Sequence, residues 1–129
     1  MLKLILPYME TKRLILRELK RSDAPHIFAY AQDPRVGPMA GWEPHKTIDD
    51  TYRFIDYAIK KRDFGQPGIF VIESKQHHKV IGTIEIHSYQ EYKAEIGFVL
   101  NPEYWNQGYI TEAAKAVIIS VSYTHLTLP

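Results

Sequence analysis

One stretch, residues 94–114, constrains the fold more than any other part of the chain; it reads AEIGFVLNPEYWNQGYITEAA. Apolar residues alternate up to Leu100, which predicts a strand, and Pro102 ends it because proline cannot donate a ladder hydrogen bond. From Tyr109 onward the apolar residues recur at helical spacing. The sequence therefore predicts a strand that stops at Leu100, a loop that contains Gly108, and a helix that begins near Tyr109.

A helix that begins behind a glycine-containing loop is a candidate anion site. The N–H groups of its first turn have no intrahelical partner, and the helix dipole places partial positive charge there, so a phosphate can accept from them. Gly108 has no Cβ and lets the backbone approach a phosphate closely. A plain strand–turn–helix connection, with Gly108 as an ordinary loop residue, accounts for the same spacing.

Two stretches carry a resemblance to a known family. Residues 95–113 (EIGFVLNPEYWNQGYITEA) resemble the acetyl-CoA-binding motif of the GNAT N-acetyltransferases, most closely in the branch of the ribosomal-protein N-terminal acetyltransferases. Residues 10–17 (ETKRLILR) are similar to the first strand of that branch. The resemblance runs from Met9 to about Ile119, and shorter motifs follow in the family's order: Asp33-Pro34, Gly41-Trp42 and residues 80–84.

The resemblance implies a fold, a reaction and a cosubstrate. The fold would belong to the α/β (α+β) class, with a mixed, mainly antiparallel sheet flanked by helices. The reaction would transfer the acetyl group of acetyl-CoA to a primary amine, on a protein N-terminus or a small molecule, by direct attack with general-base assistance. The residues implied to bind acetyl-CoA are Phe98, Val99, Leu100, Trp105, Asn106, Gln107, Gly108, Tyr109, Ile110 and Thr111.

Within that set, the resemblance assigns different roles to two groups of backbone amides. Those from Asn106 to Ile110 would hold the pyrophosphate. Those near Phe98 to Leu100, on a strand whose pairing is interrupted, would stabilise the oxyanion formed from the thioester. Two positions depart from the family's usual loop, because Trp105 stands where a basic or amide residue is common and Ile110 where a small residue is common. This branch commonly tolerates both.

Amine acetylation needs a proton acceptor as well as an anion site. An acceptor amine is cationic near pH 7 and must lose a proton before it attacks, so a general base or a water chain is required. Glu95 is the candidate base; the alternative is a strand carboxylate paired with a lysine or an arginine. Met39 and Trp42 lie in the loop that would border the acceptor pocket. An equally good interpretation of Trp42 is that its side chain covers the edge of the core.

Composition excludes several classes of protein. The chain has 129 residues, which suits one domain, and its formal net charge of +1 is too small for nucleic-acid binding by bulk electrostatics. It has no cysteine, hence no disulfide and no thiol nucleophile. The apolar run in residues 1–8 is too short for a membrane span and lacks a cleavage pattern. We expect a cytoplasmic protein whose partners are acetyl-CoA and an amine; its oligomeric state stays open.

We expect no metal site. His77 and His78 are adjacent in a predicted turn, so their side chains point apart, and no carboxylate cluster accompanies them. Thr83, Glu85 and His87 share one face of a predicted strand. They would relay protons if that face meets the substrate, and they are ordinary polar residues if it meets solvent.

The remaining elements follow from local patterns. Strands are predicted at residues 13–18, 68–74 and 79–87, and the last two form a hairpin. A helix is predicted at residues 24–31, with Ser22-Asp23 as its N-cap. A second helix runs from Thr47 to about Arg62, with one apolar stripe formed by Ile48, Tyr52, Ile55 and Ile59.

The last nine residues, 121–129, have a separate origin in our interpretation. Their sequence, VSYTHLTLP, alternates well enough for a strand, yet all nine residues match one reading frame of a transposase mosaic-end sequencing adapter. We therefore expect residues 1–120 to be the N-terminal portion of a single GNAT acetyltransferase domain and residues 121–129 to be a non-native tail. Such a fragment would lack the C-terminal half of the fold, bind acetyl-CoA poorly or not at all, and be inactive by itself. A non-catalytic CoA- or nucleotide-binding module and a structural domain are the alternatives.

Overall fold

Antiparallel strands form the centre of the molecule. The computed structural model describes residues 8–37, 43–63, 69–90 and 93–127. Within them a sheet has the order β1-β2-β3-β4-β5, and each neighbouring pair is antiparallel. The strands are β1 (Met9–Glu10), β2 (Leu14–Glu18), β3 (Ile69–Ser74), β4 (Lys79–Gln90) and β5 (Lys93–Leu100).

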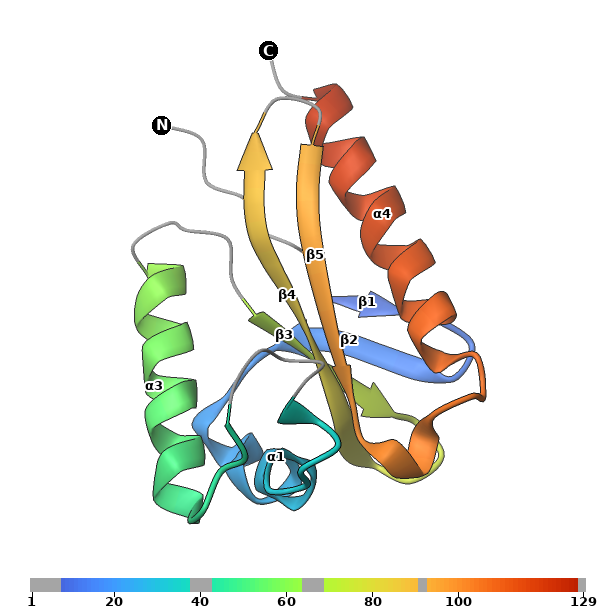
Figure 1. Cartoon of the computed structure of the whole chain (residues 1–129). Helices are drawn as coiled ribbons and strands as arrows, with labels where there is room; N and C mark the ends of the chain where they lie inside the picture. Colours follow the sequence, from blue (N-terminus) through green and yellow to red (C-terminus); the bar gives the residue numbers. More distant parts are fainter. Residues whose placement is uncertain (1–7, 38–42, 64–68, 91–92, 128–129) are drawn as a thin grey trace.

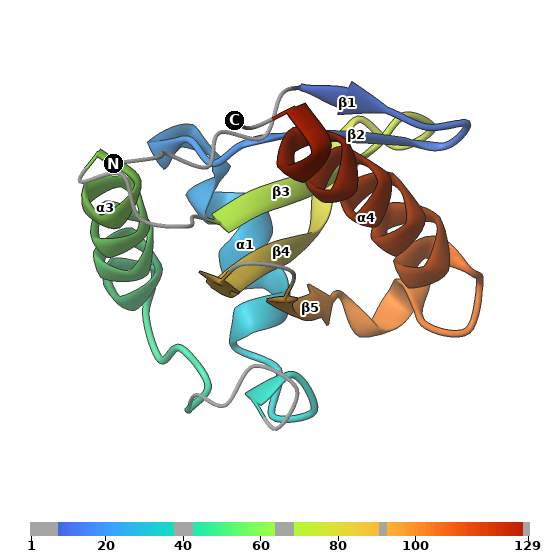
Figure 2. The ribbon, with the colours of Figure 1, turned by 90° about the horizontal axis from the view of Figure 1, so that it is seen from above.

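Helices cover both faces of this sheet (Figure 1, Figure 2). The helices α1 (Ala24–Ala31) and α3 (Ile48–Asp63) lie on one face, and α4 (Tyr109–Thr127) crosses the other. A short 3-10 turn, η1 (Arg21–Asp23), precedes α1, and a second, η2 (Pro102–Tyr104), lies between β5 and α4. The α/β class with a mainly antiparallel sheet and flanking helices, expected from the sequence, is confirmed.

Each face of the sheet has its own apolar core. Under α4, strand residues such as Leu16, Ile72 and Ile84 pack with Ala113 and Val117, all of them buried. β3 is buried on both faces, which explains its continuous apolar run, IFVI. On the other face, the buried side chains of α1, α3 and the strands include Ile27, Tyr30, Ala31, Ile55, Ala58, Val71, Val80 and Val99.

Most element bounds agree with the sequence prediction. The strand that ends at Leu100, the helix that begins at Tyr109 and the β3–β4 hairpin are confirmed. The stripe of α3 is centred on Ile55, with Thr51 and Ala58 buried beside it. The other predicted stripe residues are half-buried: Ile48, Tyr52 and Ile59.

Asp23 is the N-cap residue of α1, as predicted, but the predicted capping by its side chain is wrong. The Asp23 carboxylate makes no cap hydrogen bond to α1. It accepts instead from the Lys20 N–H at 2.8 Å and from the Arg17 guanidinium, whose Nη2 lies 2.8 Å from Asp23 Oδ1. The η1 turn in front of α1 brings this carboxylate to Arg17 of β2, so an ion pair takes the place of the cap.

β4 departs from the prediction in length and in register. It extends to Gln90, and its pairing with β5 shifts between Ile86 and Ser88. The shift is a β-bulge, which breaks the alternation at His87. The predicted common face of Thr83, Glu85 and His87 therefore does not follow from strand periodicity.

Residues 121–127 are helical and do not form a strand. α4 continues from Tyr109 to Thr127, through most of the last nine residues. The adapter origin of residues 121–129 stays a prediction. A continuous read of the source DNA across codon 120 tests it. A different sequence after that codon would support the adapter origin, and a genomic origin for residues 121–129 would contradict it.

Candidate functional site

A pocket of about 500 Å³ lies where β5 ends and α4 begins. One nearly continuous stretch lines it, the orange segment between these two elements in Figure 1. Every lining residue except Tyr104 is among those predicted to bind acetyl-CoA. The lining residues are Leu100, Tyr104, Trp105, Asn106, Gly108, Tyr109, Ile110 and Thr111.

Free backbone amides line one side of this pocket. The first i→i−4 hydrogen bond of α4 runs from the Glu112 N–H to the Gly108 carbonyl at 3.0 Å. The N–H groups of Tyr109, Ile110 and Thr111 precede that bond and have no intrahelical partner. All three residues belong to the pocket lining, and none of the lining residues is acidic. The pocket therefore presents N–H donors and the positive end of a helix dipole to an anion.

The loop in front of α4 has a left-handed backbone at two positions. Gly108 has φ = 80°, and Asn106 has φ = 63°. Glycine adopts this region freely, and asparagine does so more readily than other residues. The loop is also held from within, because Gln107 Nε2 donates to the Glu103 carbonyl at 3.0 Å. Gly108 is thus required for the loop's conformation, whether or not an anion binds.

Aromatic residues also line this pocket. Trp105 Nε1 donates to the Leu100 carbonyl at 2.8 Å, so the indole folds back over the end of β5. The Tyr104 ring packs edge-on against Tyr109, and its hydroxyl lies 2.8 Å from His77 Nδ1. Tyr104 was missed in the sequence, where the available signal was the turn that Pro102 begins.

Glu112, in the first turn of α4, is bound to the hairpin formed by β1 and β2. Its Oε1 lies 2.7 Å from Arg13 Nε, and its Oε2 accepts from the Arg13 N–H at 2.9 Å and from the Thr11 hydroxyl. Burial acts to raise the pKa of Glu112, but these hydrogen bonds outweigh it and hold the pKa below its ordinary value of 4.5. The pKa of Arg13 is raised, chiefly by its hydrogen bond to Glu112. The pair is therefore charged at neutral pH.

β5 has an outward-facing edge beside the pocket. The Asn101 N–H donates to the Ile81 carbonyl at 2.7 Å, and Val99 pairs with Thr83 two positions further along. Because hydrogen-bonded and non-hydrogen-bonded pairs alternate in an antiparallel ladder, the N–H groups of Phe98 and Leu100 point away from β4. β5 is last in the strand order, so no other strand among the described residues pairs with that edge.

The predicted site residues do not all meet at the pocket. Phe98 is partly buried on the α4 face, whereas the Val99 side chain is buried in the core of the opposite face. Gln107 belongs to the loop but is not part of the pocket lining. Glu95 pairs with Ser88 at the bulge between β4 and β5, and its side chain is not among those that the structure describes. Met39 and Trp42 lie outside the described residues.

Two further properties concern the described part of the chain. It contains no group of three or more histidine and carboxylate side chains placed to hold a metal ion. None of its helices combines the length and the apolar character that crossing a bilayer requires.

A family comparison decides the identity of the fold. The sequence profile of the acetyltransferase (GNAT) domain matches residues 13–128. The chain belongs to the GNAT family. The curated relative YoaA of Bacillus subtilis, named as an uncharacterized N-acetyltransferase, is 33% identical over 116 residues. That match covers 87% of this chain and 64% of YoaA, so the GNAT chain described here spans a little under two thirds of that relative's length.

Solved structures show the same GNAT architecture. An acetyltransferase of the GNAT family from Bacillus anthracis superposes with a TM-score of 0.73 at 27% identity, covering 87% of this chain and 64% of that one. The ribosomal-protein-S5-alanine acetyltransferase from Vibrio fischeri superposes with a TM-score of 0.67 at 23% identity, covering 87% and 65%. The expected membership of the GNAT family, with ribosomal-protein acetyltransferases among the structural neighbours, is confirmed.

Proposed function

We infer that this GNAT domain serves the transfer of an acetyl group from acetyl-CoA to a primary amine. The observation that carries the inference is that two features lie together at the pocket. These are the free amides at the start of α4 and the outward-facing edge of β5. A diphosphate accepts from the amides of Tyr109, Ile110 and Thr111. A chain leading from that diphosphate along the β5 edge brings a thioester to the N–H groups of Phe98 and Leu100.

These two N–H groups supply the electrostatic part of the reaction. They are fixed by the sheet, so they donate to the acetyl carbonyl oxygen, without reorganisation, as that oxygen gains negative charge. The amine nitrogen bonds to the acetyl carbon, the carbon–sulfur bond breaks, and the thiolate leaves on CoA. Trp105 Nε1 occupies the Leu100 carbonyl, so that this acceptor on the β5 edge already has a partner.

Glu95 is proposed as the group that takes the proton of the amine. It follows the β4–β5 bulge, at the point where the pairing of the two strands changes register. Bulges often redirect a side chain near a functional site. Met39 and Trp42 are proposed to border the acceptor, which is a protein N-terminus or a small-molecule amine. The likeness to the Vibrio fischeri enzyme supports the fold, and it leaves both acceptor classes open.

Amide chemical shifts test the binding half of the proposal. CoA is titrated into the 129-residue chain, and we expect the Gly108 to Thr111 amides to shift with saturation, as they would with inorganic pyrophosphate at higher concentration. Amides of α3, on the opposite face of the sheet, serve as the internal control. No response at the start of α4 would contradict CoA binding there and favour a structural role for the domain.

The catalytic half is tested in a chimera in which residues 1–120 replace the matching part of YoaA. Acetyl transfer to a panel of peptide N-termini and small amines identifies the acceptor class. Glu95→Gln is expected to lower kcat and to remove the acidic limb of the pH profile, because the amide cannot accept a proton. Unchanged kinetics would exclude Glu95 as the base, and CoA binding without transfer would indicate a non-catalytic module.

A further inference from the structure

Arg13 contacts the loop 105–108 without lining the pocket. Its Nη1 donates to the Gln107 carbonyl at 3.0 Å, and its Cζ lies 4.0 Å from the centre of the Tyr109 ring. A Cβ built on Gly108 would meet Arg13 Nη2 at 3.5 Å. The guanidinium therefore packs against the loop and against the first residue of α4, while its Nε pairs with Glu112.

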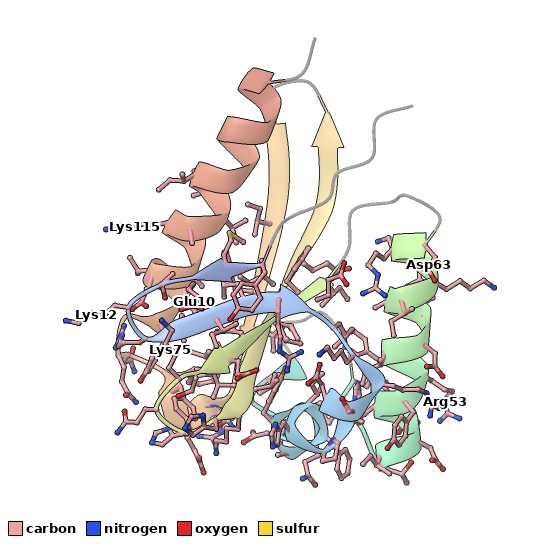
Figure 3. The ribbon with its side chains drawn as sticks, turned by 180° about the vertical axis from the view of Figure 1, so that it is seen from behind. Glu10, Lys12, Arg53, Asp63, Lys75 and Lys115 are labelled. Atoms are coloured by element: carbon pink, nitrogen blue, oxygen red, sulfur yellow. The ribbon has the colours of Figure 1, made fainter. Side chains whose placement is uncertain are left out.

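Arg13 lies in the bend between β1 and β2, directly before β2, and its backbone is hydrogen-bonded to the β3–β4 turn. Its carbonyl accepts from the Lys75 N–H at 3.0 Å, and Lys75 Nζ donates to the Thr11 carbonyl at 2.6 Å. Lys75 Nζ also lies 3.0 Å from Glu10 Oε2, and Figure 3 shows these two side chains close together. The next residue, Leu14, is fully buried in β2. Arg13 thus connects the start of β2 to the loop 105–108.

That loop needs support from outside. Asn106 and Gly108 both have positive φ, and at Asn106, which is not a glycine, this conformation persists only when the surroundings hold it. Arg13 occupies the Gln107 carbonyl, between these two residues, and so fixes the direction of the peptide planes on either side. The Gln107 carbonyl shares its peptide plane with the Gly108 N–H, and the next plane carries the Tyr109 N–H, the first of the three amides at the start of α4 that have no intrahelical partner.

We propose that Arg13 and Glu112 are positioning residues, a clamp that holds the loop 105–108 and the first turn of α4 in the geometry that receives a diphosphate. The proposal rests on the proposed function for the identity of the ligand. The clamp itself is a property of this chain in the absence of any ligand. Neither side chain touches the ligand, since neither lines the pocket.

A clamp and a simple electrostatic effect predict opposite outcomes when Glu112 is removed. Glu112 is an anion in the first turn of a helix whose N-terminus is proposed to bind an anion. If only its charge mattered, its loss would strengthen diphosphate binding. If Glu112 holds Arg13 against the loop, its loss weakens binding although a negative charge has gone. Glu103 offers a matched control, because its exposed carboxylate adjoins the lining residue Tyr104 and its loss removes the same charge.

The first measurement is the backbone order of the loop, from nuclear relaxation of the 129-residue chain without ligand. In Glu112→Ala and Arg13→Ala we expect the order parameters of the Gln107 and Gly108 amides to fall from about 0.85 to below about 0.6. Alanine favours the helix, so Glu112→Ala keeps the test valid even if Arg13→Ala does not fold. Glu103→Ala and Lys12→Ala should leave the loop unchanged; Figure 3 shows Lys12 directed away from the sheet. An unchanged loop in Glu112→Ala would overturn the proposal.

The second measurement is CoA affinity from the same amide shifts. We expect about tenfold weaker binding in Glu112→Ala, corresponding to the loss of one charge-assisted contact, and equal or tighter binding in Glu103→Ala. The CoA affinity of Arg13→Lys should lie between that of Glu112→Ala and that of the unaltered chain. A lysine keeps the charge but cannot contact Glu112 and Gln107 with one planar group. Equal or tighter binding in Glu112→Ala would refute the clamp. No CoA response in the unaltered chain would contradict the proposed function instead, and the order parameters would still decide whether the clamp exists.

Discussion

Gly108 is the residue at which sequence and site agree most directly. Its position in front of a helix indicated a loop residue with unusual backbone freedom, and the structure gives it φ = 80° beside the pocket. The sequence could not indicate that Asn106 shares this conformation or that Arg13 lies behind the loop. Glycine content is a local property, whereas the neighbours of a loop depend on the whole fold.

Gly108→Ala is expected to destabilise the chain by about 1 kcal/mol, because a Cβ disfavours positive φ. The added methyl group meets Arg13 Nη2 at 3.5 Å, an ordinary contact, so the cost comes from the backbone rather than from a clash. CoA affinity should fall with it, since the amides of the loop move. Urea denaturation and the amide-shift titration measure the two effects. Full stability with unchanged affinity would show that this φ is not needed.

At the scale of elements, ion pairs decide how neighbouring segments are joined. Arg17 of β2 lies between Asp23 of η1 and Glu73 of β3, with Arg17 Nη2 2.8 Å from Asp23 Oδ1 and Arg17 Nε 2.9 Å from Glu73 Oε1. The Asp23 side chain is 6% exposed and that of Arg17 is 19% exposed. This pair is far less solvated than the one between Arg21 and Asp56, whose side chains are both more than half exposed.

Asp23→Asn is therefore expected to lower the free energy of unfolding by about 2 kcal/mol, because it leaves a partly buried guanidinium without its closest anion. Asp56→Asn is the matched control and should cost about 0.5 kcal/mol or less, as exposed ion pairs do. Urea denaturation of both variants provides the comparison. Equal effects in the two variants would mean that burial of the Arg17 pair contributes nothing.

The contact between the β1–β2 hairpin and α4 should depend on pH. The pKa of Glu112 is lowered below 4.5 in the folded chain. A lowered carboxyl pKa contributes stability that is present above the unfolded value, near 4.5, and is lost as pH falls through the folded value. We expect the stability difference between the unaltered chain and Glu112→Gln to be constant near neutral pH and to shrink below about pH 4.5. Denaturation midpoints measured from pH 7 to pH 3 test this, and a difference that persists at pH 3 would contradict it.

At the scale of the molecule, the pocket and the β5 edge form one side of the proposed acetyl-CoA site. The sheet ends at β5 within the described residues, and the match to YoaA covers 64% of that relative. A ligand held at the start of α4 and along one strand edge buries only part of its surface, and such partial burial gives weak affinity.

We therefore expect the 129-residue chain to bind acetyl-CoA weakly, with a dissociation constant above about 100 μM, which means less than about 5.5 kcal/mol of binding free energy. The chimera of residues 1–120 with YoaA should bind at least about tenfold more tightly. Calorimetric titration of both proteins under the same conditions makes the comparison. A micromolar dissociation constant for the 129-residue chain would contradict the expectation.

The sequence by itself determined the local elements around the site. Alternation up to Leu100, the stop at Pro102 and the helical spacing from Tyr109 are decided by residues near one another, so periodicity and backbone preference were sufficient to place them. The family motif named nearly all residues that line the pocket for the same reason, because that lining comes from one continuous stretch of chain.

Only the tertiary structure decided which distant side chains support that stretch. Arg13 and Glu112 are 99 positions apart, and Tyr104 meets His77 across 27 positions. These contacts depend on strand order, on register and on the bulge in β4, where one extra residue changes which side chains face each other. No local pattern encodes those relations. They arise when the sheet and α4 bury their common core, and they set the geometry in which the free amides of α4 face the pocket.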